Sequence, residues 1–190
     1  MYLKRQDPYA LVKSMTAVKM GDRFVQVGCA HGGRLGAVAG KVGLSGRAVV
    51  VAPDEESAAR ARKGAAEEGV LVEVEVAPLT RLPIEDAGFD LAVVDDTAGL
   101  LGTMRAEDRV AAIRELVRVL RPGGRVMIVG AAPRGGLGAL ISRTQSGPPL
   151  VASGDAIKAL EADGFHSARV LAEREGLVFV EGIKPRQSHG

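Results

Sequence analysis

The sequence is poor in aromatic residues, contains a single cysteine and has no excess of charge of one sign. Aromatic residues make up 3% of the 190 residues and Trp is absent, so a stacking platform for single-stranded bases is not expected. One cysteine, Cys29, excludes an intrachain disulfide and is typical of a reducing cytoplasm, where we expect the protein. The 25 basic and 23 acidic residues leave a net charge of +2, which predicts neither a nucleic-acid partner nor an anionic membrane surface.

Long apolar runs are also missing. None approaches the ~20 residues of a membrane-spanning helix, and the first residues lack the apolar core of a signal peptide. With 46% hydrophobic residues, we expect one globular domain over residues 1–190 with a core of Ala, Val and Leu. Within it we expect an N-terminal helical segment at residues 1–20, a flap at 133–153 and a frayed tail at 184–190.

What is present is an alternation of strand-like and helix-like segments along almost the whole chain. The predicted strands are Phe24–Val27, Ala48–Val51, Leu71–Val76, Phe89–Val94, Arg125–Val129, Ala168–Leu171 and Leu177–Glu181. The predicted helices are Leu11–Met20, Leu35–Val42, Asp54–Glu68, Glu107–Leu120 and Ala156–Ala162. Strands separated by helices predict an α/β fold, a Rossmann-like, doubly wound and mostly parallel seven-stranded sheet that ends in an antiparallel hairpin.

The first predicted strand runs straight into a glycine-rich turn, Gly28-Cys29-Ala30-His31-Gly32-Gly33. Glycine supplies backbone angles that other residues avoid and lets a ligand lie against bare main chain. The helix behind the turn presents free N–H groups and a positive dipole end, which suit a nucleotide-like or carboxylate-bearing ligand. Such a turn fits a tight strand-to-helix connection equally well.

Four stretches, in this order, resemble the class I S-adenosylmethionine-dependent methyltransferases, and the resemblance covers residues 9–184. They are Val25–Gly32, Leu82–Leu91, Leu116–Arg125 with its Arg-Pro-Gly-Gly turn, and the stretch from Leu160 through Gly164-Phe165 to Gly182. The resemblance implies S-adenosylmethionine as cofactor and a small-molecule substrate. It implies no particular catalytic residue, because an activated methyl group needs alignment more than side-chain chemistry. No metal site is expected, because Asp95 and Asp96 have no His or Cys partners at metal-ligand spacing.

The resemblance also implies which positions contact the cofactor. They are Gln26, Gly28, Cys29, Ala30, His31, Gly32, Ala52, Pro53, Pro78, Leu79 and Asp95. At three of them, Gln26, Ala52 and Pro78, the chain lacks the acid that the family usually carries. Asp54 is a candidate to replace the ribose-binding acid. Asp95 and Asp96 fit a role toward an amino group or as a base, and they equally fit a cap of the next segment.

Three functions remain open from the sequence. The first is a small-molecule methyltransferase with an atypical pocket. The second is a methyltransferase-fold scaffold or regulatory partner that has lost the cofactor. The third is a nicotinamide oxidoreductase, since Gly28, Gly32 and Gly36 fit its fingerprint, although the only tyrosines, Tyr2 and Tyr9, precede the fold. A homodimer through residues 71–76 is compatible with the sequence, although the acids in that segment disfavour edge pairing.

Overall fold

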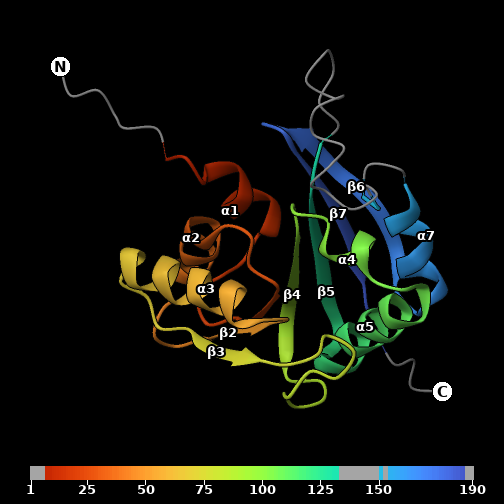
Figure 1. Ribbon diagram of the computed structural model, residues 1–190, viewed down its shortest axis with the longest axis horizontal. Coiled ribbons are helices and arrows are strands. Elements are labelled where there is room, and N and C mark those ends of the chain that lie inside the picture. The colour runs from red at the N-terminus through yellow and green to blue at the C-terminus, as the bar shows by residue number, and fades with distance from the viewer. Residues whose placement is uncertain (1–6, 133–149, 152–153, 187–190) are drawn as a thin grey trace.

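The structure, a computed structural model, describes residues 7–132, 150–151 and 154–186. It contains a seven-stranded sheet in the order β3-β2-β1-β4-β5-β7-β6 (Figure 1). The strands are β1 (Arg23–Val27), β2 (Arg47–Ala52), β3 (Glu73–Val76), β4 (Phe89–Asp96), β5 (Leu120–Ala131), β6 (His166–Arg174) and β7 (Leu177–Ile183). Strands β1 to β5 pair in parallel, whereas β7 runs antiparallel to both β5 and β6. The predicted fold class is confirmed.

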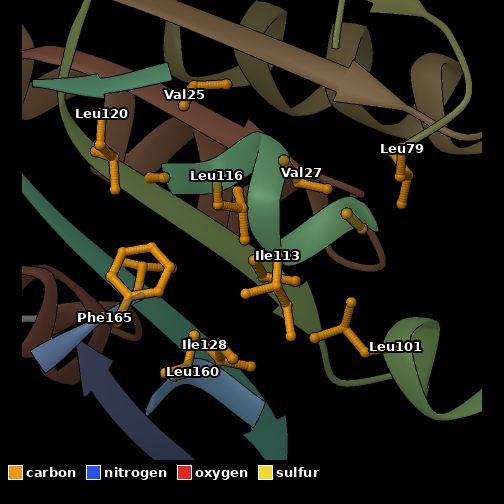
Figure 2. Close-up of a cluster of buried hydrophobic side chains, with 14 of the residues drawn as sticks. Val25, Val27, Leu79, Leu101, Ile113, Leu116, Leu120, Ile128, Leu160 and Phe165 are labelled. Carbon is orange, nitrogen blue, oxygen red and sulfur yellow. The ribbon is translucent and has the colours of Figure 1, made fainter. Parts of the chain in front are cut away.

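Helices cover both faces of this sheet, as Figure 1 shows. They are α1 (Ala10–Thr16), α2 (Gly32–Val42), α3 (Glu55–Glu68), α4 (Leu100–Thr103), α5 (Ala106–Val119) and α7 (Asp155–Ala162). Each face has its own apolar core. Leu35 and Val38 of α2 pack on one face, while Ile113 and Leu116 of α5 pack with Leu160 of α7 on the other (Figure 2). Within the described ranges, no helix is long and apolar enough to cross a bilayer.

Several predicted boundaries need correction. Helix α1 ends at Thr16, because Ala17 adopts a left-handed conformation with φ 47°, instead of continuing to Met20. Helix α2 begins at Gly32, three residues before the predicted start. Strand β5 follows α5 directly and includes the Pro-Gly-Gly turn that was expected to precede it. The short helix α4 was not predicted.

Some expectations fall on residues that the structure does not describe. The flap predicted for residues 133–153 lies outside the described residues except for Leu150 and Val151. The same holds for residues 1–6 of the N-terminal segment and 187–190 of the tail. The strand predicted at 71–76 is shorter, Glu73–Val76, and it is the outermost strand at one edge of the sheet.

Helices α2 and α3 cross at glycines, and this crossing fixes the start of α2. A Cβ on Gly64 would lie 2.1 Å from the carbonyl oxygen of Gly32, and a Cβ on Gly32 would lie 2.3 Å from the carbonyl oxygen of Arg60. Both distances are far below van der Waals contact, and the opposing atoms are backbone. The two helices therefore approach as closely as they do only because these positions lack side chains.

We expect Gly64→Ala to lower the free energy of unfolding by about 1 kcal/mol net, because the new methyl group overpacks a backbone crossing at a cost of about 2 kcal/mol. This cost exceeds the gain of about 1 kcal/mol from alanine's helix propensity. The control is Gly40→Ala in α2, where the nearest atom to the new Cβ is 3.5 Å away. It should raise stability by up to about 1 kcal/mol. Urea unfolding measures both, and a Gly64→Ala midpoint at or above that of the wild type would contradict the crossing.

Candidate functional site

The carboxyl ends of β1 and β4 lie side by side at the point where the strand order reverses. Strand β1 pairs with β2 on one side and with β4 on the other, and Val27 is the partner of Val94. In open α/β sheets, ligands bind beyond the carboxyl ends of the strands at such a switch point. The glycine-rich turn after β1 and the acids that end β4 are therefore brought together here.

Asp95 supports the glycine-rich turn with both of its carboxylate oxygens. Oδ2 accepts hydrogen bonds from the backbone N–H groups of Ala30 (2.9 Å) and His31 (3.3 Å). Oδ1 accepts from the backbone N–H (3.3 Å) and the hydroxyl (2.6 Å) of Thr97, and a guanidinium nitrogen of Arg34 lies 3.6 Å from it. A carboxylate offers about four lone-pair sites. The acceptor capacity of Asp95 is thus used within the protein.

Asp96 is as deeply buried as Asp95, at 5% exposure, yet only one of its oxygens is bound. Oδ1 accepts a hydrogen bond from the backbone N–H of Leu101 at 2.7 Å. The Asp96 side chain has no other hydrogen bond to the described part of the chain. Its second oxygen, Oδ2, accepts no hydrogen bond from the residues that the structure describes.

The surroundings of Asp96 disfavour its ionised form. The pKa of this carboxyl is raised to about 6, mainly by burial and also by the nearby Asp95 charge, while the Leu101 N–H and Arg109 limit the rise. A perturbed carboxyl in a cleft is a candidate functional group. Asp96 is not among the predicted cofactor contacts. The one feature of the sequence that points to a functional role for Asp96 is its position just after the predicted buried strand Phe89–Val94.

The first half of the glycine-rich turn combines a stretch of main chain that a ligand could approach closely, at Gly28, with the buried thiol of Cys29. Gly28 has φ 72°, and the atom nearest to an added Cβ would be the Cδ2 end of the Leu100 side chain at 2.5 Å. Cys29 is buried in the core beneath the turn, where burial raises the pKa of its thiol to about 11. Its N–H donates to the Ser57 hydroxyl at 2.9 Å. Gln26 is also buried, and its amide donates to the Gly28 carbonyl at 2.9 Å.

The second half of the turn caps and positions the first residues of α2. His31 is exposed and is the N-cap of α2, with Nδ1 accepting from the Arg34 N–H at 3.3 Å. The Tyr9 ring lies edge-on to the His31 ring, 5.7 Å between centroids. Gly32 faces α3, so its missing side chain serves helix packing rather than ligand access.

The ends of β2 and β3 bring no acid to the site. Ala52 is fully buried in β2, and Pro53 after it is exposed. Asp54 caps α3 by accepting the Ser57 N–H at 2.8 Å, so helix capping alone accounts for an acid at this position. Pro78 is exposed, whereas Leu79 is buried in the apolar core (Figure 2). In the residues that the structure describes, no cluster of His, Cys, Asp and Glu could hold a metal.

Residues 24–124 match the family model described as a methyltransferase domain, and the chain therefore belongs to this family. The predicted resemblance is confirmed. An uncharacterized 37.1 kDa protein in a Streptomyces fradiae transposon is 34% identical over 108 residues, which are 57% of this chain and 30% of that protein. The O-methyltransferase resE of Aspergillus sclerotiorum is 30% identical over 108 residues, 57% of this chain and 39% of the enzyme. The chain thus spans less than half the length of these relatives.

Solved structures of methyltransferases share the fold. A SAM-dependent methyltransferase from Aquifex aeolicus superposes with a TM-score of 0.71 at 21% identity, covering 93% of this chain and 89% of that one. A chain from the Haloferax volcanii complex with the methyltransferase activator Trm112 superposes with a TM-score of 0.69 at 17% identity, covering 95% and 89%. At these identities the likeness establishes the architecture, and the site must be argued from its own residues.

We expect Asp96→Asn to stabilise the protein at pH 7.5 and to lose most of this gain at pH 4. A pKa raised from the ordinary value near 4 to about 6 makes ionisation in the folded state unfavourable by about 3 kcal/mol. This penalty is complete above pH 6 and fades as the pH falls, because the folded protein then binds the proton. Urea unfolding at the two pH values measures it. Destabilisation at pH 7.5 would show that the charge is favourable in the fold.

Proposed function

We propose that this chain transfers the methyl group of S-adenosylmethionine to a small-molecule acceptor. The observation that carries the proposal is the left-handed turn at Gly28, which opens at the switch point of a methyltransferase-family sheet. Only the flexible end of the Leu100 side chain occupies the space that a Cβ on Gly28 would take. A ligand can displace such a group at little cost, so the described residues fit a cofactor laid along this turn.

The cofactor would be held mainly by main-chain groups. Gly28 offers close approach, and the Gln26 amide, the Asp95 carboxylate and the α2–α3 crossing hold the turn in place. At the ribose and adenine positions, Ala52 and Pro78 supply no charged acceptor. A hydrogen bond to a charged group contributes roughly 1.5–3 kcal/mol. The absence of the ribose acid therefore predicts an affinity about ten- to a hundredfold below that of a pocket that has it.

When bound, S-adenosylmethionine supplies a methyl group already activated by a sulfonium. The chain's own contribution is then to align an acceptor and exclude water, and effective molarity from alignment supplies most of the acceleration. The predicted cofactor contacts include no nucleophile–base pair, and a reaction that depends on alignment of an activated methyl group needs none.

We expect isothermal titration calorimetry to detect binding of S-adenosylmethionine and S-adenosylhomocysteine with dissociation constants in the micromolar to submillimolar range, because the main-chain contacts are kept and the ribose acid is absent. Nicotinamide dinucleotides serve as the control and should not bind. No heat of binding at millimolar ligand would contradict the proposal. It would favour the second candidate, a scaffold or regulatory protein without cofactor, which the three replaced acids motivate.

We expect Ala52→Asp to tighten the binding of S-adenosylhomocysteine by about tenfold or more, because it returns a charged acceptor to the end of β2. The matched control is Ala52→Asn, which has nearly the same shape without the charge and should improve binding much less. The same titration measures both variants, with thermal melting to confirm folding. Equal affinity of the Asp variant and the wild type would show that the ribose does not lie at this strand end.

A further inference from the structure

Asp96 ends β4, the strand between β1, which leads into the Gly28 turn, and β5. On one side, β4 neighbours β1 and the Gly28 turn. On the other side, Asp96 pairs with Gly130 of β5, where a Cβ would lie 2.7 Å from Cβ of Val151. The buried Val151 therefore closes directly over β5. Asp96 thus ends the strand that lies between the Gly28 turn on one side and Gly130 with Val151 on the other.

We propose that Asp96 is a catalytic residue whose free oxygen, Oδ2, faces the reacting methyl group and takes the proton of the acceptor. This inference rests on the proposed function. The acceptor is then an alcohol, phenol or amine, with a proton on its nucleophilic atom. As the O–C or N–C bond forms, the C–S bond breaks and its electron pair neutralises the sulfonium. The proton leaves the acceptor for Oδ2.

Three features of Asp96 support this role. Its Oδ1 is fixed by the Leu101 N–H at 2.7 Å, which orients the carboxylate, while Oδ2 has no partner in the described part of the chain. The charged groups that influence its pKa are Asp95, the preceding residue of β4, which raises it, and Arg109 on α5, which lowers it. Burial leaves the pKa of Asp96 at about 6, so it is ionised at neutral pH and is a better base than an ordinary carboxylate.

The neighbouring Asp95 does not fit the same role. Its side chain points to the opposite face of β4, as alternation along a strand requires, and its four acceptor sites are filled by Ala30, His31 and Thr97. Of the two adjacent acids, only Asp96 presents an oxygen that is available to a ligand.

The test uses sinefungin, the cofactor analogue that carries an amine-bearing carbon in place of the methylated sulfur. Its ammonium group occupies the place of the transferred methyl group, so it pairs with a carboxylate that faces that methyl, whereas S-adenosylhomocysteine has no group there. We expect Asp96→Asn to weaken sinefungin binding by about tenfold or more, and to change S-adenosylhomocysteine binding less than about threefold. Isothermal titration calorimetry at pH 7.5 measures both ligands.

The control is Glu67→Gln, which removes one negative charge from the exposed end of α3 and should leave both affinities unchanged. If Asp96→Asn weakens both ligands alike, or neither, Asp96 does not face the methyl group and the inference is overturned while the proposed function stands. If the wild type binds neither ligand, the proposed function fails and the inference fails with it.

Discussion

The Asp95 carboxylate ties the end of β4 to the turn that follows β1, and the geometry of the site depends on this tie. It satisfies two N–H groups at the start of α2, where an anion is also favoured by the helix dipole. From the other side, the glycine crossing of α2 and α3 fixes the same turn by contact between backbones. A turn held from both sides presents its main chain in one conformation, which lowers the ordering cost of binding a ligand there.

The two acids that end β4 differ because successive side chains of a strand point to opposite faces. Asp95 meets the N-terminus of α2 and finds enough donors to fill its oxygens. Asp96 meets α4 and finds one donor, so burial weighs against its charge. A fold gains nothing from such a half-satisfied carboxylate. Groups of this kind persist at functional sites, where a shifted pKa and a free lone pair are used in chemistry.

Periodicity and punctuation in the sequence were sufficient for most of the fold. The buried strands at the centre of the sheet read as continuous apolar runs, and Gly69 and Asp54 mark the ends of α3 as predicted. Helix α4 could not be predicted, because it is a four-residue turn held by the Asp96 carboxylate and the packing of Leu101. The start of β5 was also missed, since Pro-Gly-Gly resembles a loop, and only the pairing of β4 with Leu120 and Arg125 on either side includes it in the strand.

The sequence by itself determined the family, the order of strands and helices and the absence of the usual acids at positions 26, 52 and 78, because these follow from local pattern and residue identity. Tertiary structure alone decided how the remaining acids are used. Asp54 caps a helix, Asp95 holds a turn in place, and Asp96 keeps one oxygen to which no described residue donates. The number of donors that meet a carboxylate is set by segments distant in the chain, and only the folded arrangement brings them together.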